Sequence, residues 1–296
     1  MRHWLCLLFA LPALAQASQW LAVEPQPGQG QLHYYASQPA NTQARSALIV
    51  LHGFHHDARR TFDVGTGLSP NGLVIAPLFQ SRGSKCQAED EPVPQAVELQ
   101  WSCGGWAQGD PALNAPSVTS FQAMDALIAE VHRQWPSVNT ITVAGFSAGA
   151  QLVQHYIGFA APQPGLRFVV ADPGSWLYFN SARPYPVGDC PALEQWKYGT
   201  RQLPSWLAHD GQAAAKQYAA AEVHYLAGTL DTGSGKGTAY KVLDRSCAAM
   251  AQGPFRLERA QAYAQAQGAP LIEAPGCGHD VACVFNAPAA RAVLVP

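Results

Sequence analysis

A serine flanked by glycines lies near the middle of the chain, where residues 145–149 read Gly-Phe-Ser-Ala-Gly. A β-branched apolar stretch (TITVA, 140–144) precedes it and a helical pattern (QLVQHYIGF, 151–159) follows it. A serine at such a strand–turn–helix junction has a strained backbone, and the sharp turn needs small residues on either side. The turn exposes the hydroxyl and directs the N-terminus of the next helix toward the reacting oxygen. The pattern therefore predicts that Ser147 is a nucleophile, although a structural turn with an idle serine would have the same composition.

A histidine must accompany this serine, because a hydroxyl is a poor nucleophile until a base removes its proton. The chain has ten histidines. His279 is favoured because it lies in a glycine-rich loop, PGCGHD at 275–280, after the last predicted strand and late in the chain. Five others lie in strand or helix patterns or in an irregular segment, which is typical of packing or surface residues: His33, His132, His155, His209 and His224.

An acid must orient the imidazole and stabilise its cationic form. Asp231 follows the apolar stretch 222–227 through a short Gly-Thr-Leu segment, at what would be the carboxyl end of a strand. It also produces the chain order Ser, Asp, His that accompanies this kind of serine motif. Asp172 follows the stretch 167–171 and would stand at the end of the preceding strand. We favour Asp231 and keep Asp172 as the alternative.

Two backbone N–H groups must stabilise the oxyanion that forms when a serine attacks a carbonyl. One should belong to Ala148, directly after the nucleophile. The other should come from the loop after the apolar stretch 47–51, where His-Gly-Phe-His predicts Phe54 as the donor and His55 as the alternative. The same loop holds four residues that could instead bind a metal: His52, His55, His56 and Asp57. No second cluster has matching ligand spacing, so we expect no metal.

Short apolar stretches alternate with helical patterns along most of the chain, which favours an α/β fold with a mostly parallel sheet and helices on both faces. Ser117 is the expected N-cap of the helix 118–131. Residues 173–220 interrupt the alternation, and we expect a cap-like insertion there, over the carboxyl edge of the sheet, within a single domain, 18–296. Strands are expected at 47–51, 72–79, 140–144, 167–171, 222–227 and 271–274, and further helices at 57–62, 151–159 and 254–267.

Large aromatic residues gather in the two irregular segments, 81–116 and 173–220. They could line an acyl or aromatic pocket above Ser147, or they could fill small cores beneath the loops, and the sequence favours neither. The residues concerned are Trp101, Trp106, Trp176 and Tyr178, with Trp196 and Trp206 further along.

The first 17 residues predict a signal peptide, with a basic start, an apolar run at 4–14 and a small-x-small cleavage site, Ala-Gln-Ala. The run is too short to cross a bilayer as a helix, which takes roughly 20 apolar residues. We therefore expect an exported protein, secreted or periplasmic, without a transmembrane segment. Nucleic acid is not an expected partner, because only 13% of the residues are charged, the net charge is −2 and no basic block is present.

Seven cysteines are present, and all but Cys6 lie beyond the predicted signal peptide. An even number in an exported chain predicts disulfides, although six cysteines allow 15 pairings. No C-x-x-C pair suggests a zinc ribbon or a redox motif. We expect near neighbours to pair, which gives Cys86 with Cys103, Cys277 with Cys283, and Cys190 with Cys247.

After residue 17 the chain resembles the α/β-hydrolase superfamily over nearly all of its length, and within it a group of secreted esterase-like hydrolases. The resemblance implies a serine hydrolase in which Ser147, His279 and Asp231 act through an acyl-enzyme on a small-molecule or polymeric ester, with no cofactor. The segments that carry it are HGFHHDA (52–58), GLVIAPLF (72–79), VAGFSAGAQLVQHY (143–156), ADPGSWLY (171–178) with RPYP (183–186), and YLAGTLDT (225–232).

Two other functions stay open at this point. Ester hydrolysis is favoured over amide hydrolysis only because it is the commoner activity in the superfamily, so a secreted serine peptidase or amidase is one alternative. A binding protein that kept the scaffold and lost catalysis is the other, and the complete Ser, Asp and His set argues against it. The middle of the chain differs from lipases and polymer depolymerases, so the resemblance does not name the substrate.

Overall fold

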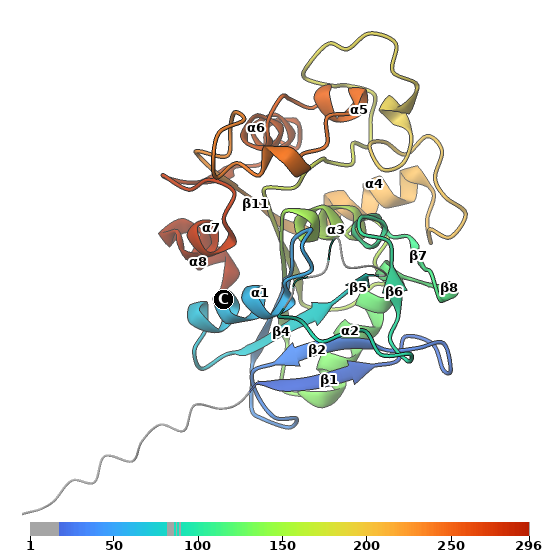
Figure 1. Ribbon diagram of the computed structural model, residues 1–296, viewed down its shortest axis with the longest axis vertical. Helices are drawn as coiled ribbons and strands as arrows, with labels where there is room; N and C mark the ends of the chain where they lie inside the picture. Colours follow the sequence, from blue (N-terminus) through green and yellow to red (C-terminus); the bar gives the residue numbers. More distant parts are fainter. Residues whose placement is uncertain (1–17, 82–85, 87, 89, 296) are drawn as a thin grey trace, which may run out of the picture.

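An eight-stranded sheet forms the centre of the protein, whose computed structural model describes residues 18–81, 86, 88 and 90–295 (Figure 1). From β4 to β12 all neighbouring strands are parallel, whereas β2 is antiparallel to both β1 and β4. The strands predicted from the sequence are these parallel ones, so the prediction of a mostly parallel sheet is confirmed. In spatial order the strands are β1 (Gln19–Val23), β2 (Leu32–Ala36), β4 (Leu73–Leu78), β3 (Ser46–Leu51), β9 (Thr140–Phe146), β10 (Leu166–Ala171), β11 (Glu222–Gly228) and β12 (Leu271–Ala274).

Helices cover both faces of the sheet (Figure 1). One face packs against α1 (Ala58–Leu68), α7 (Val281–Asn286) and α8 (Pro288–Leu294). The other packs against α2 (Ser120–Gln134), α3 (Ala148–Tyr156), α4 (Gly211–Ala220) and α6 (Arg256–Ala266). Side chains of β3 alternate between the two layers, because successive residues of a strand point to opposite faces: Leu48 and Val50 lie in the α1 layer, and Ile49 and Leu51 in the α3 layer.

The segment between β4 and α2 holds only short elements. Of these, β5 (Gln80–Ser81) pairs with β6 (Gln100–Trp101), β7 (Pro111–Ala112) pairs with β8 (Ala115–Thr119), and η1 (Gly105–Gln108) is a single 3₁₀ turn. The predicted N-cap of α2 was wrong. Ser117 lies within β8, and Thr119 caps the helix instead: its hydroxyl accepts the N–H of Gln122 at 3.1 Å, while the Gln122 side chain accepts the Thr119 N–H at 2.8 Å.

Residues 173–220 hold one 3₁₀ turn and one helix. They contain η2 (Pro191–Glu194) and end with α4. The start of the segment packs on α3 and α6, since the Leu177 N–H donates to the Gln154 side chain at 2.8 Å and the Trp176 ring stacks on Tyr263 at 4.4 Å. No residue of the segment 173–220 is among the described residues that line the cavity beside Ser147. The segment therefore adds to the core next to the site and leaves the cavity wall to other loops.

Three disulfides join the pairs that the cysteine spacing suggested. They are Cys86–Cys103, Cys190–Cys247 at the start of the short helix α5 (Cys247–Met250), and Cys277–Cys283. In the part of the chain that the structure describes, no helix has both the length and the apolar character to cross a membrane. The predicted signal peptide, 1–17, lies outside the described residues.

Candidate active site

Ser147 occupies a sharp turn between β9 and α3. Its backbone lies at φ 58° and ψ −119°, a conformation that residues with a side chain rarely adopt. A side chain at Gly145 would come within 2.3 Å of the Gly149 carbonyl oxygen, and one at Gly149 within 2.5 Å of the His52 carbonyl oxygen. Both glycines of the pattern are therefore required by close backbone approach, as the sequence predicted.

His279 reaches this serine from the loop between β12 and α7. Its Nε2 lies 2.8 Å from Ser147 Oγ, although the two residues are 132 positions apart. The backbone N–H of His279 donates to the Gly237 carbonyl at 2.7 Å, and a side chain at Gly278 would come within 2.6 Å of that same oxygen. The imidazole also packs on the Phe146 ring at 4.7 Å. Backbone and aromatic contacts together hold the ring toward the serine.

Asp231 lies on the far side of the imidazole, in the turn that follows β11. Its Oδ2 is 2.6 Å from His279 Nδ1, and its side chain is 1% exposed. Because an ionised carboxylate only accepts hydrogen bonds, Nδ1 carries the proton and Nε2 is left to accept from the Ser147 hydroxyl. The loops of Asp231 and His279 are also joined directly, since the Leu230 N–H donates to the Cys277 carbonyl at 2.8 Å.

Asp172, the alternative acid, follows β10 and is completely buried. Its two carboxyl oxygens lie 3.2 and 3.1 Å from the backbone N–H of Gly228 at the end of β11. Burial raises its pKa well above the usual range, and the neighbouring Asp231 raises it further. Asp172 thus contacts the strand that carries Asp231, and of the two carboxyl groups it is Asp231 that contacts the imidazole.

The charge state of His279 depends mainly on burial. Removal from water disfavours the imidazolium and lowers the pKa of His279, whereas the hydrogen bond to Asp231 raises it. The net shift is downward. Near neutral pH the ring is therefore in its basic form, as a group that accepts a proton from a hydroxyl must be.

The two predicted oxyanion donors belong to segments that adjoin Ser147. Ala148 is the first residue of α3, where backbone N–H groups lack a partner within the helix. Phe54 follows β3 and lines the same cavity as Ser147 and His279. The peptide group before Phe54 is anchored through its oxygen, because Gly53 O accepts from His52 Nδ1 at 2.8 Å and from the His56 N–H at 3.2 Å. The alternative donor, His55, also lines the cavity.

The histidines of this loop are occupied by backbone groups. His52 Nε2 accepts the Phe79 N–H at 3.1 Å, and His56 Nδ1 lies 2.5 Å from the Phe79 carbonyl oxygen. Both rings are buried, and desolvation lowers the pKa of each. Among the described residues, no group of three or more His, Cys, Asp or Glu side chains is arranged to hold a metal ion. The geometry assigns these rings to holding the loop.

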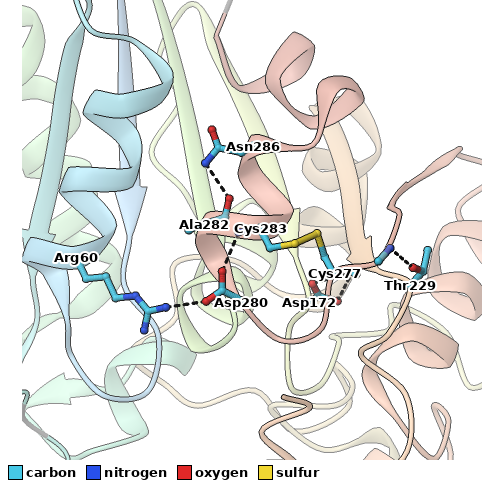
Figure 2. The surroundings of a disulfide bond; sticks show 10 residues. Arg60, Asp172, Thr229, Cys277, Asp280, Ala282, Cys283 and Asn286 are labelled. Atoms are coloured by element: carbon cyan, nitrogen blue, oxygen red, sulfur yellow. Dashed lines mark hydrogen bonds and ion pairs between the residues drawn. A yellow bond between two sulfur atoms is a disulfide. The ribbon is translucent and has the colours of Figure 1, made fainter. Parts of the chain in front are cut away.

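A cavity of about 200 Å³ opens beside Ser147 and His279. One part of its wall is apolar, with Phe54, Phe146, Val242 of the 3₁₀ turn η3 (Tyr240–Val242), and Val281. Another part is charged. Figure 2 shows Arg60 of α1 reaching across to Asp280 in the loop before α7, at 2.7 Å, beside the Cys277–Cys283 disulfide.

Sequence reasoning missed Arg60, Asp280 and Val242 as site residues. Asp280 directly follows the predicted base, and Arg60 comes five residues after His55 in the predicted oxyanion loop. Position along the chain was therefore a usable signal for these two. Val242 had no such signal, because only the fold brings residues 239–242 to the cavity.

The structure corrects the aromatic-pocket assignment. Trp106 and Trp101 pack on Phe79 at 5.1 and 5.2 Å, and Trp176 and Tyr178 pack on Tyr263 at 4.4 and 5.0 Å. These rings fill cores beneath the irregular segments, where they bury the most apolar area. At most 2% of each side chain is exposed, and none is among the described residues that line the cavity: Trp101, Trp106, Trp176 and Tyr178.

Comparison with known proteins gives a match in structure and none in sequence. No protein-family model matches the chain, and no curated protein has a significantly similar sequence. The chain is similar to the solved structure of poly(aspartic acid) hydrolase-1 from Sphingomonas sp. KT-1, with a TM-score of 0.65 and 20% identity over 95% of this chain and 99% of that one.

A second similar structure is LpqC, a poly(3-hydroxybutyrate) depolymerase from Bordetella parapertussis. Its TM-score is 0.61, with 19% identity over 89% of this chain and 85% of that one. At such identities the likeness establishes architecture alone. Together with the sheet order and the serine turn between β9 and α3, it shows that this chain has the α/β-hydrolase fold.

Proposed function

We propose that the protein is an exported serine hydrolase that cleaves carboxylic esters through an acyl-enzyme intermediate. The observation that carries the proposal is one continuous chain of hydrogen bonds, from Ser147 Oγ to His279 Nε2 at 2.8 Å and from His279 Nδ1 to Asp231 Oδ2 at 2.6 Å. A nucleophile, a base and an acid that orients the base are the groups that acyl transfer needs.

In the first step Ser147 Oγ attacks the carbonyl carbon of the ester while His279 Nε2 takes the hydroxyl proton. The imidazolium that forms is stabilised by Asp231. The carbonyl oxygen becomes an oxyanion and accepts hydrogen bonds from the backbone N–H groups of Ala148 and Phe54. Loss of one such donor typically lowers the rate by about 10²–10³.

The tetrahedral intermediate then collapses, and the bond between the carbonyl carbon and the alcohol oxygen breaks. His279 gives its proton to the departing alcohol, which leaves an ester between the acyl group and Ser147. Water attacks this ester, His279 again accepts the proton, and the carboxylic acid is released as Ser147 regains its own proton. Every step is performed by the chain's own side chains and backbone, and no cofactor is required.

The cavity supports a short acyl or hydroxyacyl group. Its volume of about 200 Å³ is below the roughly 300–1,000 Å³ of common ligand pockets. The two similar structures are named as hydrolases of poly(aspartic acid) and poly(3-hydroxybutyrate). Both polymers therefore belong in the substrate screen beside soluble esters, and a p-nitroanilide tests whether the same site cleaves amides.

Export is part of the proposal. Three disulfides require an oxidising compartment in which to form and persist, and the first 17 residues have the composition of a signal peptide. Edman sequencing of the protein recovered from the periplasm or medium of an expressing cell should begin at Ser18. A chain that remains cytosolic, with residues 1–17 still attached, would contradict this part of the proposal.

The reaction is tested with p-nitrophenyl acetate and butyrate. Ser147→Ala should abolish turnover, whereas Ser117→Ala, which changes an exposed serine in β8, should keep the wild-type rate. A fluorophosphonate should label Ser147 and no other serine, as read by peptide mapping. Turnover that survives Ser147→Ala, or a wild-type protein that neither reacts with the probe nor hydrolyses any ester, would refute the proposal and favour a binding protein on this scaffold.

A further inference from the structure

A buried arginine lies behind the proposed catalytic acid. Arg256 is the first residue of α6, and its side chain is 2% exposed. Its Nη1 lies 3.5 Å from Asp231 Oδ1 and donates a hydrogen bond to the Thr238 carbonyl at 2.7 Å. The other oxygen of Asp231 faces His279. Asp231 is thus held between the imidazole on one side and a guanidinium on the other.

The balance of buried charge makes this contact significant. An ionised carboxylate away from water is costly unless it is paired and hydrogen-bonded. Asp231 and Asp172 are both buried, and both interact electrostatically with Arg256. Burial raises the pKa of Asp172, which accepts from the Gly228 N–H, and the ion pair that Arg256 forms is with Asp231. That carboxylate is the one that orients the proposed base.

We propose that Arg256 is a positioning residue for the Ser147–His279–Asp231 array, whose guanidinium fixes the Asp231 carboxylate and disfavours a positive charge on the His279 ring. The inference rests on the proposed function. It assigns Arg256 no contact with substrate. Arg256 holds the Asp231 carboxylate in place. Its charge also keeps His279 unprotonated down to a lower pH than His279 would reach beside Asp231 alone.

The other groups that face His279 act in known directions. Burial lowers the pKa of His279 most, Arg256 lowers it as well, and Asp231 and Asp280 both raise it. Asp280 is itself paired with Arg60, which weakens its effect. The positive charge of Arg256 therefore acts against the two carboxylates, which favour a proton on His279. A charge close to an ionisable group typically shifts its pKa by about one unit or more.

The test is the pH dependence of kcat/KM for p-nitrophenyl butyrate in Arg256→Met. Without the guanidinium, His279 binds a proton more readily, so the acid limb of the profile should move up by about one to two pH units. At pH 5 the variant should therefore be about tenfold or more below wild type, and at pH 9 within about threefold of it. If Arg256→Met does not fold, Arg256→Gln is measured instead.

Two variants separate positioning from simple support of the fold. Arg259, one turn along α6, is just as buried but donates to backbone carbonyls, among them Gly253 at 2.8 Å and Asp244 at 2.9 Å. Arg259→Met should lower stability toward urea and leave the acid limb where it is. Arg256→Lys keeps a cation beside Asp231 and should return the limb most of the way to its wild-type position.

An acid limb that stays in place in Arg256→Met, or moves equally in Arg259→Met, would overturn the inference. The inference also fails if Arg256→Lys shifts the limb as far as Arg256→Met does. These outcomes are distinct from failure of the proposed function, in which the wild-type protein itself shows no ester hydrolysis that depends on Ser147.

Discussion

Replacement of Asp231 by Asn tests the proposed acid at constant side-chain volume. The hydrogen bond from His279 Nδ1 to Asp231 Oδ2 is 2.6 Å long and lies away from water, with the two side chains 7% and 1% exposed. An amide removes the negative charge and can present its NH₂ group to Nδ1, which would move the ring proton to Nε2 and away from its accepting role. We expect kcat/KM for p-nitrophenyl butyrate at pH 7 to fall by about 10³–10⁴, which is about 4–5.5 kcal/mol of transition-state stabilisation.

Asp172→Asn is the matched control. It changes the neighbouring buried carboxyl, which accepts from the Gly228 N–H and whose pKa is raised by burial. An amide oxygen can accept the same hydrogen bond, so kcat/KM should stay within about threefold of wild type. The assignment is refuted if Asp231→Asn retains more than a tenth of wild-type activity, or if Asp172→Asn loses as much as Asp231→Asn.

Three further predictions follow from the cavity, the loop of the base and its burial. Soluble p-nitrophenyl esters should show their highest kcat/KM at acetate to butyrate and fall by about tenfold or more at octanoate, because the cavity of about 200 Å³ is small for a ligand pocket; a rate that rises toward decanoate would contradict a short acyl site. Replacing Cys277 and Cys283 by Ser opens the loop that carries His279 and should lower the free energy of unfolding in urea by about 2 kcal/mol, with a fall in kcat that removal of Cys190–Cys247 does not cause; equal kcat in the two variants would argue against a role for the loop closure. Because burial lowers the pKa of His279, and the base works only when neutral, activity should be lost on acidification with an apparent pKa below 6.5; a kcat/KM profile with its acid limb centred above pH 7 would rule this out.

The elements around the serine were accessible from the sequence because their signals are local. A run of apolar residues such as 47–51 indicates a strand buried on both faces, and the glycines at 145 and 149 indicate positions where a Cβ atom would come within 2.6 Å of neighbouring backbone atoms. These patterns depend on neighbours along the chain, so the six parallel strands could be placed without knowledge of the fold. The N-cap of α2 was missed by two residues, because β8 pairs with β7 and occupies the stretch before Thr119.

The partners of the serine needed more than local pattern. Asp172 and Asp231 each follow a parallel strand, and the sequence favours Asp231 without excluding Asp172. The strands β10 and β11 are neighbours, and of the two carboxyl groups it is that of Asp231 that contacts His279. The aromatic residues show the same limit. Composition placed Trp106 and Trp176 in irregular segments, while their burial against Phe79 and Tyr263 depends on packing between distant parts of the chain.

The sequence by itself therefore determined the strand–turn–helix around Ser147, the parallel sheet and a small set of candidate partners, because these follow from short-range sterics and hydrophobic periodicity. The sequence favoured His279 and Asp231, but only the tertiary structure shows that His279, 132 residues away, meets the serine, that Asp231 rather than Asp172 contacts the imidazole, and that Arg256 stands behind it. The reason is physical: hydrogen bonds and charge pairs act over a few ångströms of space, and only the folded chain determines which distant residues come that close.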